Sequence, residues 1–217
     1  MKATVLFDLD GTLIDSTEAI VESFCYAFDT LGESPPKREA ICERIGYTLE
    51  DTFYYLGVDR EHVDEYVKTY KENYRKISRE KTFLLDGAAE AIEYASSFAR
   101  LGIVTTKTAR YSKELLEHMN VMRYFETLVG REDVVNVKPH EEPILKALSN
   151  LGCDLVQKSD VWMIGDTFLD VDAAKNAGIK HVALMTGYGN KEHLKNISDI
   201  LVDNVLEAVC VIEKNYR

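Results

Sequence analysis

Two aspartates close to the amino terminus are the clearest candidates for chemistry. Asp8 and Asp10 follow the apolar run 5–7 and come directly before Gly11. If the run is a β-strand, side chains two residues apart point the same way, so the two carboxylates share a face. Two like charges this close repel unless a cation or a proton lies between them. The pair therefore predicts a Mg²⁺ site, or a reaction in which one carboxylate attacks and its neighbour carries a proton.

Two later segments could supply partners for a phosphate. Thr105 ends the strand-like run 101–104, where its hydroxyl can donate to a phosphate oxygen. Lys138 stands directly before Pro139, which restricts the backbone and positions the lysine more firmly than a free surface would. Its ammonium can offset the negative charge of both a phosphate and Asp8. These residue types predict a binding site for an anion.

A second pair of carboxylates follows another strand-like run. Asp166 comes shortly after the strongly apolar run 161–164, and Asp170 lies four residues further on. If the chain enters a helix there, the two carboxylates face the same side. Carboxylate oxygens at a second strand end add to the prediction of a hard divalent ion.

The segment 7–16, with Asp8-Leu9-Asp10-Gly11-Thr12 at its centre, resembles the first motif of the haloacid dehalogenase-like superfamily, Asp-x-Asp-Gly-Thr. The resemblance implies that Asp8 is a nucleophile that becomes an aspartyl-phosphate and that Asp10 is the general acid and base. It also implies that backbone N–H groups after Asp8, among them those of Gly11 and Thr12, bind the phosphate. Dehalogenases of the superfamily lack the second aspartate, so Asp10 indicates phosphoryl transfer.

The other segments resemble the later motifs of the same superfamily, in the same order. Thr105 takes the place of the second motif and Lys138 that of the third, both as phosphate ligands. Close phosphatase relatives follow the second motif with Asn and Lys, whereas this chain has Thr106 and Lys107. Lys107 is the less favoured candidate for the third-motif lysine.

The fourth motif completes the implied metal site. The resemblance makes Asp166 a metal ligand and Asp170 an anchor for water or for Lys138, outside the metal's own ligands. Mg²⁺ is then the expected cofactor, held by the carboxylates of Asp8 and Asp166, the backbone carbonyl of Asp10 and waters.

The elements that must position these residues alternate between strands and helices, apart from one block. Residues 17–80 show only helical patterns and no strand pattern. The alternation elsewhere predicts an α/β fold, a Rossmann-like parallel sheet with helices on both faces, plus a small all-helical cap domain. The expected domains are a core of residues 1–16 and 81–217 and an inserted cap of residues 17–80. Strands are expected at 2–7, 101–106, 127–129, 161–164, 181–184 and 200–202, and core helices at 88–98, 112–119, 142–151, 173–177 and 205–213.

The expected cap supplies one candidate substrate contact. Arg44 lies between two predicted helices, where relatives with a helical cap place a loop that faces the substrate. It could pair with a carboxylate or a second phosphate of the substrate. Six tyrosines between Tyr47 and Tyr74 are expected to form the cap's own core first and to contact substrate only second.

The bulk composition narrows the partners. The chain has 217 residues, 46% apolar and 29% charged, and a formal charge of -11. This charge repels phosphate backbones, so nucleic acid is not an expected partner. The cysteines show no zinc or disulfide spacing, which predicts reduced, mostly buried thiols at Cys25, Cys42, Cys153 and Cys210. Asp8 comes too early for a signal peptide and no run is long enough to span a membrane, so we expect a cytoplasmic monomer or homodimer.

The leading functional prediction is a Mg²⁺-dependent phosphatase for a small phosphorylated metabolite. The run from Gly165 to Gly178 looks most like the phosphoglycolate phosphatase branch. A pyrophosphatase, a sugar-phosphate phosphatase and a β-phosphoglucomutase-like mutase use the same chemistry and stay open. Two other classes are a phospho-accepting signalling module and a binding protein without catalysis. The helical block and Asp10 disfavour the first, and the full set of motif residues disfavours the second.

Overall fold

A computed structural model describes residues 2–152 and 158–216 of the chain. The chain divides into two compact units, one formed by Met1–Asp15 with Leu84–Arg217 and the other by Ser16–Phe83. We call them the core unit and the helical unit. The sequence patterns predict boundaries after residues 16 and 80, whereas the two units divide after residues 15 and 83.

The core unit is built on a parallel sheet of six strands in the order β5-β4-β1-β6-β7-β8. Each neighbouring pair is parallel, and β1 lies inside the sheet between β4 and β6. The predicted α/β fold with a parallel sheet is therefore confirmed. The strands are β1 (Ala3–Phe7), β4 (Ala99–Val104), β5 (Phe125–Val129), β6 (Val161–Gly165), β7 (Lys180–Leu184) and β8 (Leu201–Val202).

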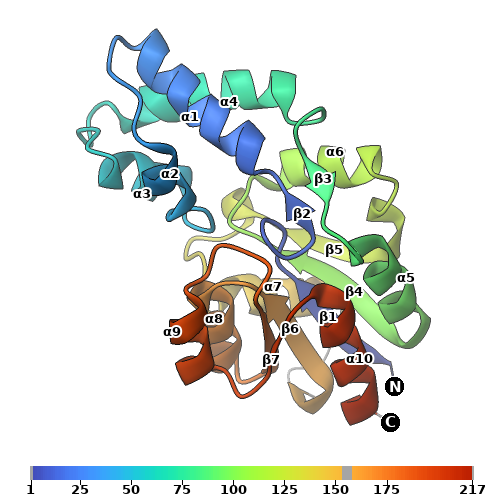
Figure 1. The fold of residues 1–217 in the computed structure, drawn as a ribbon. Helices are drawn as coiled ribbons and strands as arrows, with labels where there is room; N and C mark the ends of the chain where they lie inside the picture. Colours follow the sequence, from blue (N-terminus) through green and yellow to red (C-terminus); the bar gives the residue numbers. More distant parts are fainter. Residues whose placement is uncertain (1, 153–157, 217) are drawn as a thin grey trace. The chain divides into compact units, whose positions relative to one another are not determined.

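Helices cover both faces of this sheet (Figure 1). Alternate residues of β1 face opposite sides: Val5 and Phe7 join one apolar cluster, and Leu6 joins another. The first cluster includes buried residues of α5 and α10, which lie side by side, and the second includes residues of α7 and α8. The helices of this unit are α5 (Ala88–Phe98), α6 (Ala109–His118), α7 (Glu142–Asn150), α8 (Phe168–Ala177), α9 (Lys191–Ile197) and α10 (Val205–Tyr216).

Shorter elements complete the described chain. The strands β2 (Ile14–Asp15) and β3 (Phe83–Leu84) pair as a second, two-stranded sheet where the chain passes between the units. Single 3₁₀ turns are η1 (Met122–Tyr124), η2 (Arg131–Asp133) and η3 (Lys158–Asp160).

The helical unit packs around aromatic rings. Its helices are α1 (Thr17–Thr30), α2 (Arg38–Cys42), α3 (Leu49–Tyr55) and α4 (Val63–Ile77). The ring of Phe53 lies 4.6 Å from that of Phe24 and 5.5 Å from that of Tyr66, centroid to centroid. Rings at such distances contribute beyond the area they bury, so this cluster adds to the unit's stability.

The six tyrosines from Tyr47 to Tyr74 differ in burial, and Tyr47 is half-buried. Tyr66, Tyr70 and Tyr74 are buried, as the prediction of a tyrosine core requires. Tyr54 and Tyr55 are 51% and 53% exposed, so for them the prediction is wrong. Two neighbours on one short helix cannot both face the same side, and here neither lies in the core.

Other differences from the predictions are local. The helix expected to start at Ser112 begins at Ala109, and Ser112 instead donates its hydroxyl to the Thr108 carbonyl at 3.0 Å, one turn back. The helix α9 was not predicted. Cys25, Cys42 and Cys210 form no disulfide and are half-buried, not buried, while Cys153 lies outside the described residues. No helix of the described chain combines the length and apolar character that crossing a membrane requires.

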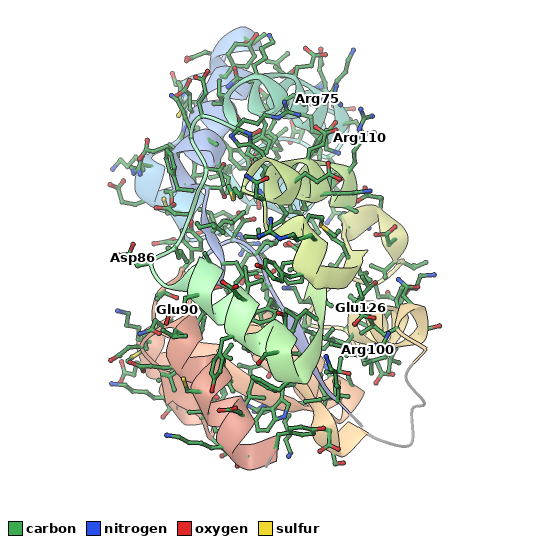
Figure 2. The ribbon with its side chains drawn as sticks, turned by 90° about the vertical axis from the view of Figure 1, so that its right-hand side faces the viewer. Arg75, Asp86, Glu90, Arg100, Arg110 and Glu126 are labelled. Carbon is green, nitrogen blue, oxygen red and sulfur yellow. The ribbon has the colours of Figure 1, made fainter. Side chains whose placement is uncertain are left out.

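One charged pair ties the edge strand β5 to β4. Arg100 and Glu126 lie side by side (Figure 2), with Nη2 of the arginine 2.7 Å from Oε2 of the glutamate. Arg100 also donates from Nη1 to the carbonyl of Leu151 at 2.6 Å. The Arg100 guanidinium lowers the pKa of Glu126 through these hydrogen bonds.

Candidate active site

Three polar residues stand at the carboxyl ends of three adjacent strands. Asp8 follows β1, Thr105 follows β4 and Asp166 follows β6. Because Phe7 pairs with Ile103 on one side and Ile164 on the other, Thr105 and Asp166 come one residue beyond the level of Asp8. The strand order runs from β1 to β4 and β5 on one side and to β6, β7 and β8 on the other, and ligands bind at such a reversal of strand order. The fold thus places the sequence-predicted residues where an open α/β sheet binds its ligands.

A cluster of buried carboxylates forms at this edge. Asp8, Asp166 and Asp170 each offer an oxygen within 4.8 Å of the others, and the three residues are 3%, 0% and 1% exposed. Lys138 reaches into the same cluster, with Nζ 2.8 Å from Oδ1 of Asp8 and 2.6 Å from Oδ1 of Asp170. The structure therefore brings together four of the residues that the sequence singled out.

The cluster holds more negative charge than its lysine can balance. Burial raises the pKa of Asp8 to about 7, against the opposing effect of Lys138. Burial and the neighbouring Asp170 and Asp8 raise the pKa of Asp166 well above its usual range. Burial works against the charge of Lys138, but Asp170 and Asp8 together raise its pKa. Three buried carboxylates facing one ammonium form an oxygen-only donor set with surplus charge, and such a set fits Mg²⁺.

Asp166 is held from two sides. Thr12 donates its hydroxyl to Oδ1 at 2.9 Å, and the backbone N–H of Tyr188 donates to Oδ2 at 2.8 Å. A Cβ atom at Gly187 would overlap the Asp166 carboxyl, so only glycine lets this backbone approach so closely. The sequence analysis assigned no role to this segment: the two glycines flanking Tyr188 indicate a turn after β7, but they do not identify Asp166 as the partner.

Asp170 is fixed by the start of helix α8. The backbone N–H and the hydroxyl of Thr167 both donate to Oδ2 of Asp170, at 3.0 and 2.7 Å. This is a capping interaction between the N-cap residue and the third residue of the helix. It leaves the other oxygen, Oδ1, to accept from Lys138.

Asp10 forms an ion pair with a second lysine, Lys107. Lys107 Nζ lies 3.1 Å from Oδ2 of Asp10, and both side chains are largely buried. The repulsion expected between Asp8 and Asp10 is thus relieved by two cations, one for each carboxylate. Lys107, which the sequence ranked below Lys138, also donates its backbone N–H to the hydroxyl of Thr105 at 3.2 Å.

Gly11 and Thr12 lie in the turn that follows Asp8. Their backbone N–H groups donate within the turn, from Gly11 to the Ile14 carbonyl at 2.9 Å and from Thr12 to the Leu9 carbonyl at 3.1 Å. Phosphate binding by Gly11 and Thr12 stays a prediction. Gly11 instead supplies a positive φ of 83°, which favours glycine, and Thr12 orients Asp166 through its side chain.

Arg44 belongs to the helical unit and not to the cluster. Its guanidinium lies 3.6 Å from the ring centroid of Tyr47 and 4.5 Å from that of Tyr55. Its Nε is buried and has no hydrogen-bond partner among the described residues. Two aromatic rings thus support the guanidinium of Arg44 within the helical unit.

Comparison with known proteins agrees with this geometry. Residues 5–184 match the family model of the haloacid dehalogenase-like hydrolases. A pyrophosphatase PpaX from Halalkalibacterium halodurans is 37% identical over 82% of this chain and 80% of its own length. A second pyrophosphatase PpaX, from Bacillus velezensis, is 35% identical over 91% of this chain and 94% of its own.

A solved structure shares the fold along the whole chain. The crystal structure of a predicted phosphatase from Clostridium acetobutylicum superimposes with a TM-score of 0.87 at 27% identity, and it covers 99% of both chains. The family match spans most of the strand ends described above, including those that carry Asp8, Thr105 and Asp166. The chain therefore belongs to the haloacid dehalogenase-like hydrolases, as a phosphatase of that family.

Proposed function

We propose that this protein is a Mg²⁺-dependent phosphatase that hydrolyses a small phosphorylated metabolite through an aspartyl-phosphate on Asp8. The observation that carries the proposal is the setting of Asp8: a buried carboxylate at the end of β1, 2.8 Å from the Lys138 ammonium and clustered with Asp166. A carboxylate in this setting can attack a phosphate, because fixed positive charge offsets the repulsion between the two anions.

The carboxylates of Asp8 and Asp166 and the backbone carbonyl of Asp10 would hold the ion. When bound, Mg²⁺ would neutralise charge between Asp8 and a phosphate dianion. Asp170 lies in the same cluster, but it accepts from Thr167 and from Lys138. We therefore assign Asp170 to holding the lysine.

The reaction proceeds in two displacements at phosphorus. In the first, an Asp8 oxygen bonds to phosphorus, the bond to the leaving oxygen breaks, and Asp10 gives that oxygen its proton. In the second, water attacks the aspartyl-phosphate, Asp10 takes a proton from the water, and phosphate leaves with Asp8 restored. Thr105 and Lys138 hold the other phosphate oxygens, and Lys107 keeps Asp10 in place.

Pyrophosphate is the first candidate substrate. Two relatives at 37% and 35% identity are named pyrophosphatases, which moves phosphoglycolate, the first candidate from sequence motifs, to second place. Both molecules carry a second anionic group beyond the transferred phosphate. We assign recognition of that group to Arg44, whose Nε has no hydrogen-bond partner among the described residues. Sugar phosphates, with an uncharged leaving group, rank below both.

A phosphate-release screen tests the proposal. Purified protein with Mg²⁺ is given pyrophosphate, phosphoglycolate, sugar phosphates and nucleotides, with Asp8→Asn as the control. We expect release to be fastest from pyrophosphate and to disappear with a chelator or in the variant. Undiminished release in either case would overturn the mechanism, and release from phosphoglycolate alone would reverse the order of substrates. Phosphoryl return to a sugar without release of phosphate would indicate a mutase.

A further inference from the structure

The loop that carries Lys138 is tied down by one carboxylate. Oε1 of Glu142 accepts from the backbone N–H of Val135 at 2.9 Å. Oε2 accepts from the backbone N–H and from the side-chain amide of Asn136, both at 2.9 Å. Glu142 thereby holds the two residues that lie two and three positions before Lys138.

We infer that Glu142 is a positioning residue for the reaction. By fixing the loop before Lys138, it sets where the Lys138 ammonium lies. The inference rests on the proposed function, because it takes Lys138 as the cation that faces the phosphate. Glu142 itself is partly exposed and touches neither Asp8 nor any other carboxylate of the cluster in the described structure.

Other contacts hold the loop on either side of Val135 and Asn136: Val134 packs against an apolar cluster of the core, and Nδ2 of Asn176 donates to the Pro139 carbonyl at 2.8 Å. The Val135 side chain is 82% exposed, so burial of apolar surface does not anchor the backbone there. Glu142, in contrast, is the first residue of α7, whose Ile144, Ala147 and Leu148 are buried against the sheet. The hydrogen bonds from Val135 and Asn136 also hold the pKa of Glu142 below its usual value, so the carboxylate stays charged. The loop is thus fastened to a rigid element of the core.

Lys138 needs such support because its ammonium must lie at a defined position in the site. Its side chain has a long flexible stem, yet Nζ must stay 2.8 Å from Asp8 and 2.6 Å from Asp170 in a buried site. A shift of the loop backbone moves the start of that stem, and displacements of about 1 Å in an active site can cost about a hundredfold in rate. The Glu142 contacts prevent this shift.

A matched pair of variants tests the inference by kinetics. Glu142→Gln loses one acceptor oxygen and the charge, whereas Glu141→Gln loses the same charge one residue earlier. The Glu141 side chain makes no cap hydrogen bond or ion pair within the described residues. With pyrophosphate and Mg²⁺, we expect kcat to fall about tenfold to a hundredfold in Glu142→Gln. Glu141→Gln should stay within about twofold of wild type, and equal rates in the two variants would overturn the inference.

Repeating the substitution in a Lys138→Ala protein distinguishes a positioning role of Glu142 from an effect on general stability. In Lys138→Ala, the group that Glu142 positions is gone, so adding Glu142→Gln should change the residual rate less than about twofold. An equal loss in both backgrounds would show that Glu142 acts on the fold and not through Lys138. If Glu142→Gln does not fold, Asn136→Ala removes one of the three contacts and should give a smaller loss that also vanishes with Lys138→Ala.

A spectroscopic measurement judges the inference even if no substrate is turned over. The Lys138 ammonium is buried between two carboxylates, so its protons should exchange slowly enough for a ¹⁵N-detected NMR signal, assigned by its loss in Lys138→Ala. We expect this signal to shift or broaden in Glu142→Gln and to stay unchanged in Glu141→Gln. An unchanged signal in a folded Glu142→Gln protein would refute the positioning role. Absence of phosphate release from every substrate, by contrast, would count only against the proposed function.

Discussion

The core unit and the helical unit handle charge in opposite ways. In the core unit, buried carboxylates and lysines pair with one another at strand ends, as Asp8 does with Lys138 and Asp10 with Lys107. In the helical unit the interior is mainly apolar and rich in aromatic rings, and Arg44 rests on the rings of Tyr47 and Tyr55. The contrast suggests a division of labour: a preorganised core fixes the reaction, and the helical unit selects the substrate. Each prediction below tests one side of that division.

Removal of the Asp8 carboxylate should have the largest effect. Asp8→Asn keeps the shape of the side chain but removes the attacking oxygen, so we expect phosphate release to fall by about 10⁴-fold or more on every substrate. Single-turnover assays with pyrophosphate and p-nitrophenyl phosphate would measure it. A loss confined to one substrate would mean that the core does not carry the common chemistry.

The sequence predicts the existence of elements better than their first residues, for physical reasons. The strand β1 and the helix α5 carry continuous local signals, an apolar run and a helical period, and α5 lies at its predicted bounds of Ala88–Phe98. The starts of two helices were misread, because they depend on hydrogen bonds between side chains and the backbone. Ser112 looked like an N-cap but bonds within α6, and α8 begins at Phe168 and not at 173 because Thr167 and Asp170 cap it.

The candidate site shows the same limit. Asp8, Asp166, Asp170 and Lys138 come together as expected, because each follows a strand end or a loop whose place the parallel sheet determines. Contacts between distant loops could not be read from local patterns. The Tyr188 N–H on Asp166 is one such contact, and the occupied N–H groups of Gly11 and Thr12 depend on the shape of the whole turn.

The aromatic interior predicts the largest stability effect. Phe53 is fully buried and lies between the rings of Phe24 and Tyr66, so Phe53→Ala should lower the free energy of unfolding by about 3–5 kcal/mol. Tyr54→Ala, at the exposed neighbouring position, should cost less than about 1 kcal/mol. Denaturant titrations of both variants would measure the difference, and equal losses would contradict an aromatic core centred on Phe53.

Arg44→Gln tests the helical unit's part in substrate choice. A charged hydrogen bond to the second anionic group contributes about 1.5–3 kcal/mol, so kcat/KM for pyrophosphate should fall about 10- to 100-fold. For p-nitrophenyl phosphate, whose leaving group has no second anion, it should change less than about twofold. Arg60→Gln removes a guanidinium that stacks on Tyr54 in the same unit and serves as the control. Equal losses on both substrates would remove Arg44 from substrate selection.

The core unit should also couple metal binding to pH. Burial raises the pKa of Asp8 to about 7 and that of Asp166 well above its usual range, so both bind protons that Mg²⁺ must displace. Affinity for Mg²⁺ should therefore fall as the pH drops below 7, by about tenfold per unit for each proton released. Calorimetric titrations in buffers of different ionisation enthalpy would count those protons. Binding that does not change between pH 8 and pH 6 would contradict the shared site.

The smallest effect is expected when an ion pair on the surface of the core unit is broken. Arg100 and Glu126 bond closely, but their side chains are 33% and 49% exposed, so Glu126→Gln should cost only about 0.2–1 kcal/mol. Because Arg100 lowers the pKa of Glu126 from 4.5 in the folded state, this contribution is present above pH 4.5 and is lost as the pH falls through the lower, folded value.

Urea titrations of wild type, Glu126→Gln and the exposed control Glu93→Gln at neutral and acidic pH would measure this difference in stability. We expect wild type and Glu126→Gln to converge in acid, and Glu93→Gln to stay close to wild type at neutral pH. A difference that persists unchanged in acid would mean that Glu126 acts through packing and not through its charge. The contribution of charge would then also be in question for the ion pair between Arg38 and Glu18 in the helical unit, whose side chains are both more exposed.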